Sequence, residues 1–159
     1  MTPRQLADLI DSHAAALVLF ARQWCSAPED VVQDSLCKLA ARPAPPADPV
    51  AWLFRVARNG AIDAGKADRR RRRREAAAAR PLRWFDEAAV GGLDASDAVA
   101  ALEELAAEYR EVIVARLWGG LTLEGVAAVV GCSVSSAHRR FEAGVAALRE
   151  RLGVPCPKT

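Results

Sequence analysis

Residues 121–152 contain two helical hydrophobic patterns separated by a glycine, and this arrangement constrains the fold more than any other feature of the chain. In the first pattern, apolar residues recur every three or four positions: Leu123, Val126, Ala127 and Val130. Gly131 then interrupts the pattern, and Ser133 is placed to cap a second helix. The spacing predicts a helix-turn-helix, a pair of short helices typical of DNA-binding proteins.

The second helix of this motif has an apolar and a polar face. The apolar face is formed by Val134, Ala137, Phe141, Val145 and Leu148. Small hydroxyls and arginines fall on the opposite side: Ser135, Ser136, Arg139 and Arg140. These side chains suit the major groove of duplex DNA, although any pair of helices with a solvated polar face gives the same pattern. His138 is expected to be a helix-flank or packing residue and not a catalyst.

Composition predicts an all-α protein, because helix-forming residues dominate and β-branched and aromatic residues are sparse apart from valine. The net charge of +2 is unevenly distributed. Residues 1–75 hold 13 basic and 9 acidic side chains, whereas residues 99–159 hold seven of each. Six consecutive arginines, Arg69–Arg74, account for the positive excess. They could lie along a DNA backbone or form a solvated tract.

Several kinds of chemistry find no support in the sequence. The 4 cysteines form no CxxC pair, so we expect reduced thiols and no bound metal. His13 and His138 lie far apart in the sequence, and no phosphate-binding glycine loop is present. We therefore expect no cofactor and no catalytic activity. Without a long apolar run or a signal-peptide pattern, we expect a cytoplasmic protein with no membrane insertion.

The chain divides into two helical modules. We expect one helix over residues 6–23, a second that a capping box at Ser26–Glu29 opens and that runs to about Ala41, and a third from Val50 into the arginine run. A loop at 42–49 with four prolines separates the last two helices.

Residues 76–98 contain a proline, a Gly-Gly pair and turn formers, and are predicted to be a linker. A further helix is expected from Val99 to Leu117. The predicted division is two small helical domains, 1–75 and 99–153, with the linker 76–98 between them and a tail at 154–159.

Two helices of the first module have polar faces. In the helix after Pro28, Asp30, Gln33 and Asp34 lie opposite the apolar residues, as a solvated face or an acidic docking surface for a partner protein. In the helix from Val50, the core positions are Val50, Leu53, Phe54, Ala57 and Ala61. The opposite face carries Trp52, Arg55, Asn59, Asp63 and Lys66.

The face that begins at Trp52 allows two interpretations. An indole, an amide and cations in one row could stack on unpaired bases and hold phosphates. Alternatively, Trp52 packs against a neighbouring helix and Asp63 pairs with Lys66.

Three segments, in this order, resemble the extracytoplasmic-function (ECF) sigma factors of the sigma-70 family: EDVVQDSLCKLA, PVAWLFRVARNGAID and LEELAAEYREVIVARLWGGLTLEGVAAVVGCSVSSAHRRF. The resemblance implies promoter-specific transcription initiation with core RNA polymerase. It implies that Asp30, Gln33 and Asp34 dock on the clamp coiled coil of the largest polymerase subunit. It also implies that an anti-sigma factor is a further partner.

The resemblance also implies two contacts with promoter DNA. The −10 element, held as a single strand, would be bound by Trp52, Arg55, Arg58, Asn59, Asp63, Lys66, Arg69 and Arg70. Among these, Asn59 is the candidate for contacting a flipped base. The −35 element, as duplex, would be read by Ser135, Ser136, Arg139 and Arg140.

This chain departs from the family pattern in places. Lys66 and Ala143 stand where arginines are usual, the 42–49 loop is shorter and richer in proline, and Gly125 is inserted in the first helix of the helix-turn-helix. A conventional helix-turn-helix regulator, with an N-terminal module for regulation or dimerisation, is the alternative. A small helical enzyme would require an acid–base site that the sequence lacks.

Overall fold

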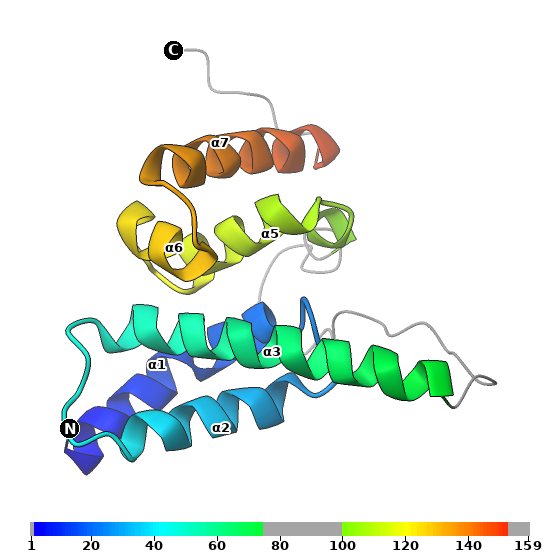
Figure 1. Cartoon of the computed structure of the whole chain (residues 1–159). Helices are drawn as coiled ribbons and strands as arrows, with labels where there is room; N and C mark the ends of the chain where they lie inside the picture. The colour runs from blue at the N-terminus through cyan, green and yellow to red at the C-terminus, as the bar shows by residue number, and fades with distance from the viewer. Residues whose placement is uncertain (1, 75–99, 153–159) are drawn as a thin grey trace.

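The structure, a computed structural model, describes residues 2–74 and 100–152, and every regular element in these ranges is helical. The elements are α1 (Pro3–Ala21), α2 (Pro28–Ala40), α3 (Pro49–Arg74), α5 (Ala107–Ile113), the π-helix η2 (Val114–Trp118), α6 (Leu123–Val130) and α7 (Val134–Arg151). Residues 100–103 are also helical. The predicted all-α class is confirmed. Helices α1–α3 form one layer, and the elements from α5 to α7 form a second layer upon it (Figure 1).

The helix ends of the first layer differ from the prediction in one place. Thr2 and Gln5 form a capping box at the start of α1, each side chain accepting from the other's backbone N–H. The capping box expected at Ser26 is wrong, because α2 begins after Ala27 with no side-chain cap. The Ser26 hydroxyl instead donates to the carboxylate of Asp68 on α3, at 2.5 Å. The Ser26 hydroxyl thus donates to a side chain on a distant helix instead of accepting from a nearby backbone N–H, as a capping box requires.

The core of the first layer is built from the predicted positions of α3. Leu53, Phe54, Ala57 and Ala61 are fully buried. The ring of Phe54 meets that of Phe20 edge-on, with centroids 5.1 Å apart. Further along α3, a Cβ on Gly65 would lie 2.0 Å from the carbonyl oxygen of Trp24. Only glycine allows this close approach of α3 to the end of α1.

The second layer contains the predicted helix-turn-helix. Gly131 ends α6 with a φ of +79°, and the Ser133 hydroxyl accepts from the backbone N–H of Ser136 at 3.1 Å. The uninterrupted helix expected from Val99 to Leu117 is wrong. The chain leaves helical geometry at 104–106, and α5 then passes into the π-helix η2.

The break at 104–106 has a packing cause. It lets Leu102 and Leu105 pack against Ile113 in a small second core, with Phe141 and Leu148 of α7 at its edge. The local sequence pattern does not contain this information, because the apolar spacing continues through the break.

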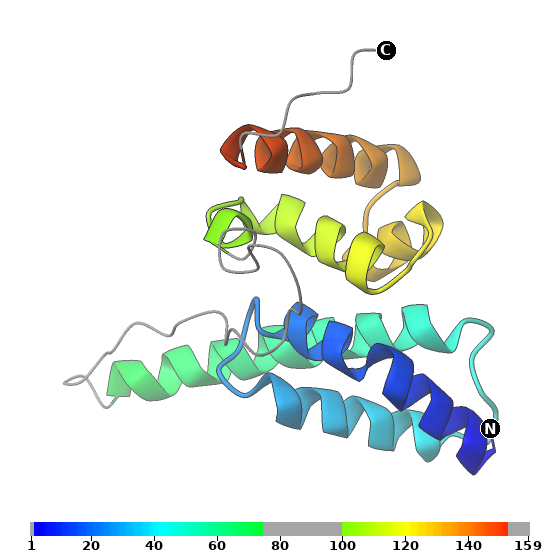
Figure 2. The same cartoon turned by 180° about the vertical axis from the view of Figure 1, so that it is seen from behind.

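The two layers share one hydrophobic core. Leu17, Phe20 and Phe54 belong to the same cluster of buried residues as Val112 and Val126. A Cβ on Gly119, at the end of η2, would lie 2.6 Å from the Phe54 ring. Both views show the second layer resting on α1 and α3 (Figures 1 and 2). The two modules are therefore packed together; the predicted linker, 76–98, lies outside the described residues.

Within 2–74 and 100–152, no helix is both long and apolar enough to span a bilayer. The same residues include no group of three or more His, Cys, Asp or Glu side chains arranged to hold a metal ion.

Candidate nucleic-acid interfaces

The acidic face of α2 points to solvent. Asp30, Gln33 and Asp34 are exposed, while Val32 and Leu39 on the other side are buried. Lys38 lies 2.6 Å from the Asp34 carboxylate, but both side chains are more than half exposed. Such a pair stabilises a helix by only about 0.3–0.5 kcal/mol. A partner's cation could therefore replace Lys38 at little energetic cost.

The outer face of α3 is exposed along its length. Arg55, Asn59, Asp63 and Lys66 are all exposed, so the structure brings them together in one row. The Lys66 ammonium lies 3.4 Å from the Asp63 carboxylate, which confirms the expected pairing. The two side chains are 54% and 77% exposed, so solvent screens the pair and Lys66 can still reach a phosphate.

The packing interpretation of Trp52 is confirmed, and its stacking on unpaired bases stays a prediction. It is half-buried and packs against the edge of the core. The guanidinium of Arg42, from the proline-rich loop, lies 5.4 Å from the centroid of its ring. Arg42 was not among the predicted site residues, because this cation–π contact depends on how the loop folds back over α3.

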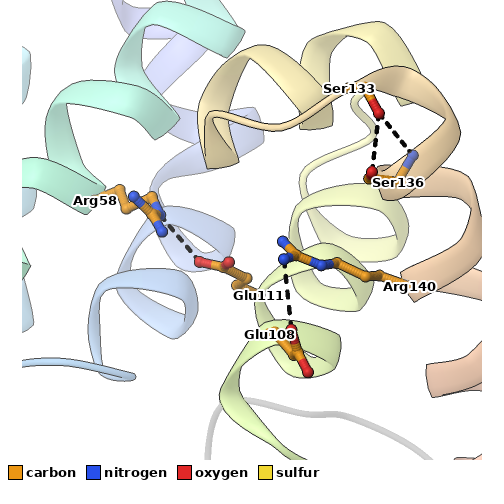
Figure 3. A network of polar contacts seen from close by, with 6 residues as sticks. All are labelled: Arg58, Glu108, Glu111, Ser133, Ser136 and Arg140. Atoms are coloured by element: carbon orange, nitrogen blue, oxygen red, sulfur yellow. Dashed lines mark hydrogen bonds and ion pairs between the residues drawn. The ribbon is translucent and has the colours of Figure 1, made fainter.

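Arg58 lies on a different side of α3 from its neighbour Asn59. Its Nε donates to the Glu111 carboxylate of α5 at 3.0 Å (Figure 3). Its guanidinium lies 5.6 Å from the centroid of the Trp24 ring. Burial raises the pKa of Glu111, and the hydrogen bond and charge of Arg58 oppose that rise. In this arrangement Arg58 faces the second layer instead of solvent.

The arginine run is helical, because α3 extends to Arg74. Arg69, Arg70 and Arg71 are exposed, and Arg71 pairs with Asp68 at 3.1 Å. Positive charge at a helix C-terminus is favoured by the helix dipole. The run therefore extends the cationic surface of α3.

The four residues of α7 that were predicted to contact DNA differ in their exposure to solvent. Ser135 and Arg139 are exposed. Ser136 is half-buried, and its hydroxyl lies 2.9 Å from that of Ser133. Arg140 is half-buried and lies 3.4 Å from the Glu108 carboxylate of α5 (Figure 3).

His138 and Val134 are more exposed than expected. Of the two roles predicted for His138, helix flank or packing, the packing role is wrong, because His138 is exposed on α7 beside Arg139. Val134 was assigned to the apolar face but is 43% exposed. The face that packs is centred on two small residues, Ala137 and Gly144, where a Cβ on Gly144 would lie 2.8 Å from Ile113 Cδ1. This spacing of small residues was the available signal for the true orientation of α7.

Comparison with known proteins extends these observations. The family model of Sigma-70 region 2 matches residues 9–75, and that of Sigma-70 region 4 matches residues 97–148. The ECF RNA polymerase sigma factor SigL of Mycobacterium tuberculosis is 31% identical over 158 residues, covering 92% of this chain and 89% of SigL. The chain belongs to the ECF sigma factors of the sigma-70 family.

Two solved structures have a similar fold. The sigma factor RpoE of Bartonella quintana, in complex with the anti-sigma factor NepR, aligns with a TM-score of 0.70 and 28% identity, over 98% of this chain and 100% of RpoE. CnrH, in complex with the cytosolic domain of CnrY, aligns with a TM-score of 0.59 and 25% identity, over 98% of this chain and 92% of CnrH.

As an ECF sigma factor, the protein acts in promoter-specific initiation of transcription by RNA polymerase. The alternative of a conventional helix-turn-helix regulator is not favoured, because the region 2 match assigns the N-terminal module to the sigma-70 family as well.

Proposed function

We propose that this ECF sigma factor divides its work among three helices: α2 docks on core RNA polymerase, α3 opens the −10 element, and α7 contacts the −35 duplex. The observation that carries the proposal is the exposure of a distinct polar face on each of these helices. The domain division 1–75 and 99–153, with a linker at 76–98, belongs to this proposal. The protein itself catalyses no reaction and works in the cytoplasm, where bacterial RNA polymerase acts.

Docking rests on Asp30, Gln33 and Asp34, which meet a basic surface of the clamp coiled coil. Because all three are exposed, binding needs no rearrangement of α2. An acidic stripe facing a basic one speeds association and fixes the orientation of the partner.

Opening of the −10 element rests on α3. Lys66, Arg69 and Arg70 hold phosphates, while Trp52 and Asn59 contact bases that have left the duplex; Arg55 and Asp63 complete the face. The Arg42 guanidinium above Trp52 joins this set as a phosphate or base contact. Arg58 can contact the −10 element only after its ion pair with Glu111 has broken.

Recognition of the −35 element rests on Ser135 and Arg139, and His138 extends the same exposed surface. Ser136 and Arg140 contact DNA at the edge of this surface, where their bonds to Ser133 and Glu108 also orient them. An anti-sigma factor binds this protein too, in line with the anti-sigma factor NepR that is bound to the similar sigma factor RpoE.

Run-off transcription with core RNA polymerase on a promoter library tests the function as a whole. We expect initiation from a subset of promoters, and loss of both polymerase binding and transcription on Asp30→Lys with Gln33→Ala. Asp11→Lys, an exposed aspartate on α1, is the matched control and should behave as wild-type. Absence of promoter-specific initiation from protein that binds core polymerase would contradict the proposal.

The role of Asn59 has a separate test. Asn59→Ala should reduce permanganate reactivity of the −10 thymines more than it reduces closed-complex affinity, because the amide contacts only an unpaired base. Equal losses in the two measurements would remove Asn59 from strand opening.

A further inference from the structure

One short helix, α5, engages an arginine from each of the two candidate DNA-binding surfaces. Glu111 pairs with Arg58 of α3, and Glu108, one turn earlier, pairs with Arg140 of α7 (Figure 3). The Arg140 charge also acts on Glu111. The four side chains form a row of alternating charge that runs from the first module into the second.

The pair between Arg58 and Glu111, hereafter the inter-module pair, is well shielded from water. The two residues are 53 positions apart in the sequence, and their side chains are 21% and 7% exposed. The Trp24 ring covers the guanidinium on the side of the first module. Removing one member of an ion pair this buried leaves the other charge uncompensated, which destabilises a protein much more than the loss of a surface ion pair does.

In the packed arrangement, the two DNA-binding surfaces are too close together to reach both promoter elements at once. Sites centred near −35 and −10 are about 25 base pairs apart, which is about 85 Å at about 3.4 Å per base pair. A compact chain of this length has a radius of gyration of only about 15 Å. Since α6 packs on α3, and α7 packs on α5 and α6, the two surfaces cannot span that distance without separating.

We infer that the inter-module pair holds the two modules in a closed arrangement that cannot engage a promoter, and that its opening is a step toward the active sigma factor. The closed arrangement is a property of the chain itself, which can be tested without DNA or polymerase. Its inhibitory effect rests on the proposed function.

The two partners contribute unequally to the closed state. Without Arg58, the Glu111 carboxylate would be left 7% exposed without its hydrogen-bonded cation and with only the charge of Arg140 acting on it, which disfavours closure. Without the Glu111 charge, Arg58 still contacts the Trp24 ring, and its side chain is more exposed to water than that of Glu111. We therefore expect Arg58→Gln to open the modules more than Glu111→Gln does.

Distances between spin labels test the closed state in the full chain. One nitroxide is placed at native Cys37 on α2 and one at Ala146→Cys on α7, both exposed, with the other three cysteines replaced by alanine. Wild-type protein should give one short distance. Arg58→Gln should raise the ratio of open to closed molecules at least about tenfold.

Two further variants control this experiment. Arg22 is 23% exposed and pairs with Glu29 inside the first module, so Arg22→Gln removes an arginine of similar exposure without breaking an ion pair between the modules. It should keep the wild-type distance. The exchange Arg58→Glu with Glu111→Arg should recover the short distance, which a merely misfolded chain would not. An unchanged distance in Arg58→Gln, equal opening in Arg22→Gln, or an exchange variant that stays open would each overturn the inference.

Affinity for core polymerase tests the inhibitory effect separately. If closed molecules bind poorly, Arg58→Gln should bind core polymerase more tightly, by up to the factor by which its open fraction has risen. Unchanged affinity in a variant shown to be open would overturn the inhibitory role. Loss of binding by wild-type and Arg58→Gln alike would contradict the proposed function instead.

Discussion

Ser133 and Ser135 are two positions apart at the start of α7, yet their side chains have different surroundings. The Ser133 hydroxyl accepts from the backbone N–H of Ser136 and begins the helix. Ser135 is exposed and belongs to the surface that we assign to DNA. One hydroxyl is therefore structural, and the other is available to a ligand.

This difference predicts a separation of effects. Ser133→Ala should lower the free energy of unfolding by about 1 kcal/mol, as expected for a lost N-cap. Ser135→Ala should change stability by less than about 0.5 kcal/mol but weaken binding to −35 duplex. Urea unfolding and fluorescence anisotropy measure the two quantities. Equal destabilisation by both variants would mean that the cap contributes nothing specific.

At the scale of single residues, the sequence predicted which side chains are exposed better than it predicted their ion-pair partners. The exposed row from Arg55 to Lys66 follows from helical periodicity, which is a local property. The partners of Arg58 and Arg140 could not be predicted, because each ion pair depends on how distant helices pack. His138 was misplaced because small residues, instead of Val134, set the packed face of α7.

At the scale of elements, some glycines are required because a side chain would clash with a neighbouring element, whereas others have room for a side chain. A Cβ on Gly119 would lie 2.6 Å from the Phe54 ring and 2.5 Å from the Ala115 carbonyl oxygen. A Cβ on Gly125, in α6, would meet its nearest neighbour at an ordinary 3.5 Å. The first glycine is required by packing, and the second is not.

Alanine substitutions should therefore change stability in opposite directions. Gly119→Ala is expected to lower the free energy of unfolding by about 1–3 kcal/mol, because η2 and α3 must move apart. Gly125→Ala should raise it by up to about 1 kcal/mol, because alanine is the better helix former. Thermal and urea unfolding measure both. A stabilised Gly119→Ala variant would contradict the close packing of η2 on α3.

The long helices and the helix-turn-helix were predictable because caps, prolines and apolar spacing are local signals. The break at 104–106 and the π-helix η2 were not, because the apolar spacing runs through both. They are decided by the fit of Leu102 and Leu105 against Ile113, and by the contact of Gly119 with Phe54. Tertiary packing overrides local preference at these points.

For the whole molecule, the packing of the modules should depend on pH through Glu111. Burial raises the pKa of this carboxyl, with the hydrogen bond and charge of Arg58 opposing the rise, so the folded chain holds the proton more readily than the unfolded chain. The stability that this contributes is fully present below the unfolded pKa and is lost as pH rises through the raised value.

We therefore expect the wild-type free energy of unfolding to show an extra downward slope above about pH 4.3, the ordinary pKa of a glutamate, which Glu111→Gln lacks. Urea unfolding of both proteins from pH 4 to pH 8 measures the difference between the two curves. Parallel curves would show that Glu111 titrates alike in the folded and unfolded chains.

The shared core has a consequence for the lifetime of the opened protein. When the modules part, side chains such as Phe54, Val112 and Val126 lose neighbours across the boundary and meet water. Newly wetted apolar surface promotes aggregation and invites proteolysis. A sigma factor opened without a partner would therefore be short-lived, so its abundance in the cell would follow the supply of polymerase that can bind it.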